Sequence, residues 1–164
     1  MKRQRHIAIL FLLLAAIFLP AYAQDKVYHA PDGGVRAVIT AVGKKGSAEN
    51  RIEIRHAKGT LLQRKSFASA GGAHGVSINQ AAWTTDGNYF VFNTESAGGH
   101  QPWHKTTYFY SRRANRFYCL DDFIGPVTSD FELTEQHTIK TTRFNFSINQ
   151  EKEPITVRLS KLHR

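Results

Sequence analysis

The chain has 164 residues, of which 22 are lysine or arginine and 13 are aspartate or glutamate, so its formal charge is +9 at pH 7. Its single cysteine, Cys119, excludes an intrachain disulfide, and the fold must therefore be stabilised by packing. A basic surface favours anionic partners such as phosphorylated glycolipids, anionic phospholipids, acidic polysaccharides or acidic proteins, without selecting among them.

The first 23 residues have the pattern of a secretory signal peptide. Three basic residues at positions 2 to 5 precede an apolar run at 7–19, and Ala21-Tyr22-Ala23 has the small residues of a cleavage site. The run is shorter than the about 20 residues that cross a bilayer. We therefore expect cleavage after Ala23, no transmembrane anchor in the mature chain, and a periplasmic or secreted protein. Cleavage would lower the formal charge from +9 to +6.

The remaining residues, 24–164, are predicted to form a single all-β domain, because apolar residues alternate with period two and show no sustained helical stripe. The first predicted strands are 35–42 and 51–57. A turn at Lys58-Gly59 leads into a third strand at 61–68, which completes a hairpin.

The middle of the chain predicts a second hairpin, with strands at 78–84 and 89–95 joined by a turn that contains Asp86-Gly87. The second of these strands is apolar on both faces and is therefore expected to be covered on both sides. One face carries Tyr89 and Val91, and the other carries Phe90 and Phe92.

Two further hairpins are predicted toward the C-terminus. Strands at 105–111 and 116–122 are joined across residues 112–115. Alternating apolar residues at 144–148 and 155–160 predict a last hairpin, with Pro154 at the strand edge, where its missing N–H costs little.

Two segments are alike, HAPDGGVRAVI at 29–39 and AAWTTDGNYFVF at 81–92, because each places an Asp-Gly turn ahead of an apolar strand. They resemble the repeats of TolB-like periplasmic β-propellers, whose blades carry a Trp-Ser-Pro-Asp-Gly-like turn before an inner apolar strand. The matching residues are Pro31, Asp32 and Gly33 in the first segment, which lacks the tryptophan, and Trp83, Asp86 and Gly87 in the second.

The resemblance covers about two blades, residues 28–122, and implies that the protein serves as a binding platform. Closed propellers usually have four or more blades of about 40 residues. Residues 24–164 could make three blades or a cramped four. We therefore expect an all-β fold of antiparallel propeller-like blades or a two-sheet stack, and not a closed full propeller.

The stretch AGGHQPWHKTTYFYS, 97–111, allows three interpretations. His100, Trp103, His104 and Tyr108 could form an aromatic and imidazole surface for a sugar or acyl ligand. The same histidines could join His74, from the similar loop SAGGAHG, in a metal site. The loop could also fold back onto the sheet and serve only to satisfy its own polar groups.

Arg112 and Arg113 crowd the predicted turn after 105–111, together with Arg116. They could form an anion-binding rim, or they could be the solvated residues of an ordinary turn. The candidate ligand-binding residues are therefore His100, Trp103, His104, Tyr108, Arg112 and Arg113.

Motifs of common enzymes are absent from the sequence, among them Gly-x-Ser-x-Gly, His-Glu-x-x-His and a phosphate-binding loop. We therefore expect a non-enzymatic binding module, without a cofactor, that recognises an envelope protein or an anionic glycolipid or polysaccharide. Nucleic acid is not expected as a partner of an exported chain. The alternative is a small metal-dependent hydrolase that uses the two Gly-Gly-His loops.

Overall fold

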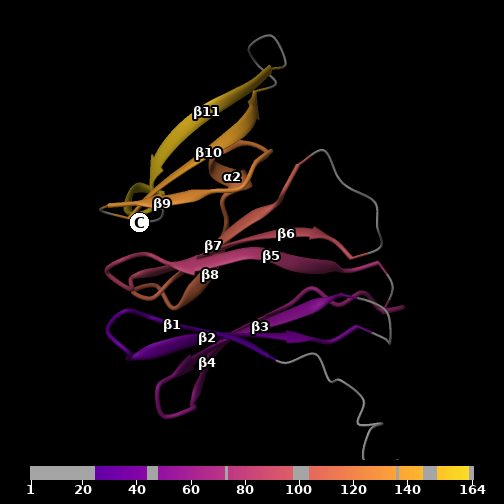
Figure 1. Cartoon of the computed structure of the whole chain (residues 1–164), viewed down its shortest axis with the longest axis vertical. Helices are drawn as coiled ribbons and strands as arrows, with labels where there is room; N and C mark the ends of the chain where they lie inside the picture. The colour runs from indigo at the N-terminus through magenta and orange to yellow at the C-terminus, as the bar shows by residue number, and fades with distance from the viewer. Residues whose placement is uncertain are drawn as a thin grey trace, which may run out of the picture.

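The computed structural model describes residues 25–43, 48–72, 74–97, 104–135, 137–145 and 151–162. In these residues, eleven strands form three antiparallel sheets, with one short α-helix and one 3-10 turn. The sheets lie one above the other, from the N-terminal sheet at the bottom of Figure 1 to the C-terminal sheet at the top. The prediction of an all-β fold without a closed ring is confirmed, and the sheets number three rather than two.

The first sheet has the order β1-β2-β3-β4, in which each strand pairs with the next along the chain. Its strands are β1 (Lys26–His29), β2 (Val35–Ala41), β3 (Asn50–His56) and β4 (Leu61–Ser66). The predicted strands correspond to β2, β3 and β4, whereas β1 was not predicted. Gly33 and Gly59, with φ angles of +68° and +97°, provide the left-handed residues of the turns that lead into β2 and β4.

The second sheet repeats this pattern with the order β5-β6-β7-β8. Its strands are β5 (Val76–Trp83), β6 (Tyr89–Ser96), β7 (Thr107–Ser111) and β8 (Arg116–Cys119). The predicted β5–β6 hairpin is confirmed, and Gly87 has the expected positive φ angle, +68°. The predicted strand 116–122 is too long, because it ends at Cys119 and the helix α2 (Asp121–Ile124) follows.

The third sheet has the order β11-β10-β9. Its strands are β9 (Glu132–Thr134), β10 (Thr138–Asn145) and β11 (Glu151–Arg158), and the 3-10 turn η2 (Leu159–Lys161) follows. The last predicted hairpin corresponds to β10 and β11, but both strands begin earlier than predicted, at Thr138 and Glu151. Residues 146–148 lie outside the described residues. Pro154 lies inside β11 and not at the end of a strand, but β11 is an edge strand of this sheet.

The apolar core is divided into two layers by the middle sheet. Phe90, Phe92 and Tyr110 pack toward the first sheet, against Ile52 and Ile54 among others. The opposite face of the middle sheet packs toward the third sheet, through Tyr89, Val91, Phe109, Leu120, Ile139 and Leu159. The prediction that β6 is covered on both faces is therefore confirmed.

Polar contacts join the first sheet to the second, and they involve both of the similar segments, 29–39 and 81–92. The indole N–H of Trp83 in β5 donates to the carbonyl oxygen of Tyr28 in β1, at 2.9 Å. Asp32, in the turn before β2, accepts a hydrogen bond from Arg112, in the turn after β7, at 2.6 Å. In the next pair of sheets, Asp86 makes the corresponding contact with His137, at 2.9 Å.

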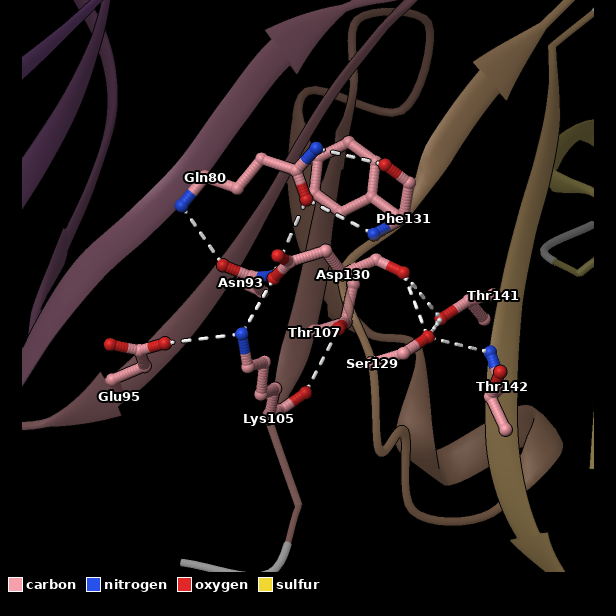
Figure 2. A network of polar contacts seen from close by, with 10 residues as sticks. All are labelled: Gln80, Asn93, Glu95, Lys105, Thr107, Ser129, Asp130, Phe131, Thr141 and Thr142. Carbon is pink, nitrogen blue, oxygen red and sulfur yellow. Dashed lines mark hydrogen bonds and ion pairs between the residues drawn. The ribbon is translucent and has the colours of Figure 1, made fainter. Parts of the chain in front are cut away.

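A polar network joins the second sheet to the third (Figure 2). The side-chain amide of Gln80 donates to the carbonyl oxygen of Phe131 and accepts from its N–H, at 2.8 and 3.0 Å. The fully buried Asn93 accepts from the backbone N–H of Gln80 at 2.9 Å and donates to Asp130 at 3.0 Å. Lys105 completes the network through ion pairs to Asp130, at 2.7 Å, and Glu95, at 3.2 Å.

Candidate functional site

The outer face of the first sheet carries a groove of about 600 Å³. Successive side chains of a strand point to opposite faces. Because Ile52 and Ile54 of β3 face the core, the residues between and beside them point outward. The outward residues that line the groove are Asp25, Val27, Arg36, Val38, Thr40, Arg51, Glu53, Arg55 and Arg64.

The strand register brings the charged residues of three strands together on this face. Arg36 of β2 pairs with Arg55 of β3, so two like charges lie directly opposite each other. Glu53 of β3 pairs with Val38 on one side and with Arg64 of β4 on the other. Glu53 thus lies at the centre of the groove, with arginines around it.

Glu53 is only 5% exposed, although it carries a charge. Its two carboxylate oxygens accept hydrogen bonds from the Nε atoms of Arg55 and Arg64, each at 2.8 Å. The Nε atom of Arg51 lies 3.4 Å from the same carboxylate. Burial by itself raises the pKa of Glu53, but the hydrogen bonds and charges of Arg55 and Arg64 outweigh it and hold that pKa below its usual range. Glu53 is therefore ionised at neutral pH.

The carboxylate of Glu53 does not neutralise this group of arginines. Among the described residues, the groove is lined by four arginines and two carboxylates, which leaves an excess of two positive charges. The Nε atoms of Arg36 and Arg51 are buried and have no hydrogen-bond partner among the described residues. Arginine presents donors in a fixed fork that fits carboxylate and phosphate groups, so this arrangement can bind an anion.

The two described residues of the predicted aromatic site, His104 and Tyr108, do not line this groove. His100 and Trp103 are outside the described residues. The Nε2 atom of His104 lies 3.3 Å from the hydroxyl of Thr106. Tyr108 stacks on Phe92, at a ring distance of 5.5 Å, in the layer between the first two sheets, and burial raises its pKa to about 12.

The two predicted arginines lie at the other end of β7 from Tyr108. Arg112 is bound to Asp32 of the first sheet, whereas Arg113 is exposed in the turn after β7. The Arg112 guanidinium, together with the backbone N–H of Gly34, holds the pKa of Asp32 below its usual range. Arg112 therefore connects two sheets, and the structure does not bring it together with His104 or Tyr108.

The first Gly-Gly-His loop, at 69–75, is held by a buried carboxylate. Glu49 is fully buried and accepts hydrogen bonds from the hydroxyl of Ser69 and the N–H of Gly75, each at 2.6 Å. His74 is exposed, and its backbone N–H donates to Ser69. Among the described residues, which exclude His100, no group of three or more histidine, cysteine, aspartate or glutamate side chains could hold a metal ion.

The groove was not predicted from the sequence, although part of its signal is visible there. The run Arg51-Ile52-Glu53-Ile54-Arg55 alternates charged and apolar residues, so two arginines and a glutamate must share one face of a strand. The signal was incomplete because Arg36 and Arg64 come from other strands. Only the register of β2 and β4 against β3 brings them to the same place.

Comparisons with known proteins give little further guidance. No protein-family model and no curated protein sequence matches this chain. Among solved structures, the chain is similar to hydrazine synthase of Kuenenia stuttgartiensis, with 13% sequence identity and a TM-score of 0.40. That match covers 71% of this chain and 39% of the other, and a likeness of this size identifies no function. In the part of the chain described here, no helix has the length and apolar character needed to span a bilayer.

Proposed function

We propose that this protein is an exported, non-enzymatic binding module that holds an anionic ligand in the groove of the first sheet. The signal-peptide pattern supports a periplasmic or secreted location, where anionic glycolipids, polysaccharides and acidic proteins of the envelope are the available partners. Two successive four-stranded sheets with Asp-Gly turns in equivalent places support a relation to TolB-like propeller repeats, which act as binding platforms.

The observation that carries the proposal is the unneutralised charge around Arg36. Its buried Nε atom has no hydrogen-bond partner among the described residues, and its neighbour across the strand pair is another arginine. Like charges directly opposite each other destabilise a sheet, and a buried donor without a partner costs about 1–3 kcal/mol. A bound anion would remove both penalties, which gives a physical reason for this arrangement.

An NMR titration of the purified protein with sulfate, at constant ionic strength, tests the proposal. We expect the largest amide shifts in β2, β3 and β4, and we expect Arg36→Gln to weaken sulfate binding about tenfold, because one charged hydrogen bond is lost. Lys140→Gln is the matched control, because it removes one positive charge from an exposed position in β10 of the third sheet. Shifts confined to other sheets, or equal losses in both variants, would contradict the proposal.

A further inference from the structure

We propose that the anionic group bound in the groove is a phosphomonoester, held in its dianionic form by Arg36, Arg51 and Arg64. This inference rests on the proposed function and names the chemistry of its ligand. It follows from three features of the groove: its excess charge, the donors that remain unused, and the carboxylate of Glu53 at its centre.

The excess charge favours a ligand with more than one negative charge. Four arginines and two carboxylates leave two positive charges uncompensated. A carboxylate or a phosphodiester brings one negative charge. A phosphomonoester carries about −1.5 to −2 at pH 7, with a second pKa of about 6, and therefore neutralises the groove as a single group.

The donors that remain for a ligand are distributed over three strands. Arg55 is the most engaged of the four arginines, because its Nε and Nη2 atoms contact Glu53 and its Nη1 atom donates to the carbonyl oxygen of Gly59 at 2.8 Å. Arg36 of β2, Arg51 of β3 and Arg64 of β4 all line the same groove. The buried Nε atom of Arg36 has no hydrogen-bond partner among the described residues, and that of Arg51 has only the 3.4 Å contact with Glu53. Arg64 donates to Glu53 through its Nε atom at 2.8 Å, which leaves its Nη groups for a ligand. Three donor groups on three strands suit the three terminal oxygens of a phosphoryl group better than the two oxygens of a carboxylate.

Glu53 holds two of the arginines in place and sets the net charge that a ligand meets. Its carboxylate is ionised, buried and held by hydrogen bonds from Arg55 and Arg64. It lowers the positive charge of the groove but does not cancel it. The remaining positive charge attracts a dianion twice as strongly as a monoanion, because the interaction energy is proportional to the charge of the ligand.

Calorimetric titration of the purified protein at pH 5.0 and 7.5, at constant ionic strength, tests this inference with four probes. The probes are methyl phosphate, dimethyl phosphate, acetate and sulfate. We expect methyl phosphate to bind about tenfold more tightly at pH 7.5 than at pH 5.0. Its second pKa is about 6, so only about a tenth of it is dianionic at pH 5.0, whereas nearly all of it is dianionic at pH 7.5. At pH 7.5 it should also bind about tenfold more tightly than dimethyl phosphate or acetate.

Sulfate serves as a control that distinguishes the effect of pH on the protein from the effect of pH on the charge of methyl phosphate. Among the described residues, the charged and titratable groups on this face are Asp25, His29, Arg36, Arg51, Glu53, Arg55 and Arg64. His29 pairs with Arg36 across β1 and β2 and therefore lies on the same face as the groove. Sulfate stays dianionic across this range, and its pH dependence therefore measures the contribution of the protein alone.

The failures of the two proposals are distinguishable. If none of the four anions binds, the proposed function itself is wrong. If acetate and dimethyl phosphate bind as tightly as methyl phosphate, the groove binds anions but is not a phosphomonoester site. The same conclusion follows if the affinity for sulfate rises with pH as much as the affinity for methyl phosphate does. Vesicles that contain phosphatidic acid, compared with phosphatidylglycerol vesicles and with soluble methyl phosphate, then show whether the phosphoryl group comes from a lipid or from a soluble molecule.

Two variants locate the site. Arg36→Gln should weaken binding of methyl phosphate about tenfold without loss of folding, since it relieves the repulsion with Arg55. Glu53→Gln should increase the affinity for methyl phosphate more than the affinity for acetate, because the repulsion that it removes is twice as large for a dianion. Thermal melting of both variants checks that they are folded, and Lys140→Gln should bind like the unmodified protein. An unchanged preference for the dianion in folded Glu53→Gln would overturn the role given to Glu53.

Discussion

At the scale of single residues, Gly75 shows how the first Gly-Gly-His loop is closed. A Cβ atom at this position would overlap the carbonyl oxygen of Phe67 and lie 2.7 Å from the carboxyl carbon of Glu49. Both neighbours are fixed, because Phe67 accepts from the N–H of Val76 and the Glu49 carboxylate is buried and bound to the loop. The glycine is therefore required by space and not by its φ angle.

We predict that Gly75→Ala lowers the free energy of unfolding by about 1–3 kcal/mol, the usual range for overpacking at a fixed site. Urea denaturation measures this value. Gly71→Ala is the matched control in the same loop, because nothing lies within 4 Å of a Cβ atom built there. An equal loss of stability in both variants would show that the loss does not come from the contact with Glu49.

At the scale of the elements, the junction between β5 and β6 depends on a buried amide. The register of the two strands shifts between Ile78 and Ala81, which leaves the backbone N–H of Gln80 without a partner in the ladder. The side chain of Asn93 accepts this hydrogen bond and donates another to Asp130, which precedes the third sheet. One side chain thus stabilises a bulge and joins two sheets.

We predict that Asn93→Ala destabilises the protein by about 1–3 kcal/mol, because it leaves the part-buried N–H of Gln80 without its partner and removes the hydrogen bond to Asp130. Chemical denaturation gives the value, and hydrogen exchange should show faster exchange of the Gln80 amide than in the unmodified protein. Gln63→Ala in the edge strand β4 is the control and should change stability by less than about 0.5 kcal/mol. Unchanged exchange at Gln80 would refute this account of the bulge.

The predicted elements were most accurate where the chain makes local hairpins. Asp86-Gly87 between two apolar runs identified the β5–β6 hairpin, because a tight turn needs a left-handed residue. The short strands β1 and β9 were missed, since few residues in them can show an alternation. The residues Asp121 and Asp122 were assigned to a strand, although they form the first turn of α2.

At the scale of the whole molecule, carboxylates connect the three sheets. Asp32 is paired with Arg112, Asp86 with His137, and Asp130 with Lys105. The pKa of each of these carboxyl groups is lowered, for Asp32 and Asp130 chiefly by hydrogen bonds from Arg112 and Lys105. Burial raises the pKa of Asp86, but bonds from Thr84, Asn88 and His137 outweigh it.

We predict that stability is lost below about pH 4. Because the pKa values of these carboxyl groups are lower in the folded state, their contribution is present above the unfolded pKa of about 3.9 and is lost as pH falls through the folded pKa. Burial raises the pKa of Asp121, so its protonation in acid offsets a small part of the loss.

Thermal melting between pH 8 and pH 2.5 measures this effect. The melting temperature should be nearly constant from pH 8 to pH 5 and should fall below pH 4. Arg112→Gln should melt below the unmodified protein at neutral pH, and this difference should shrink in acid, where Asp32 is protonated in both proteins. A difference that stays constant down to pH 2.5 would show that the Asp32–Arg112 pair does not contribute to acid sensitivity.

The sequence by itself determined that this chain is all-β, because two-residue alternation sends side chains to opposite faces of an extended strand, whatever its partners are. It also determined that β6 must be covered on both faces, since both are apolar. The tertiary structure decided which polar residues meet. Arg36, Arg51 and Arg64 lie on three strands, and their shared groove depends on strand register. Register is fixed by long-range pairing and core packing, so it is not contained in the pattern of any one strand.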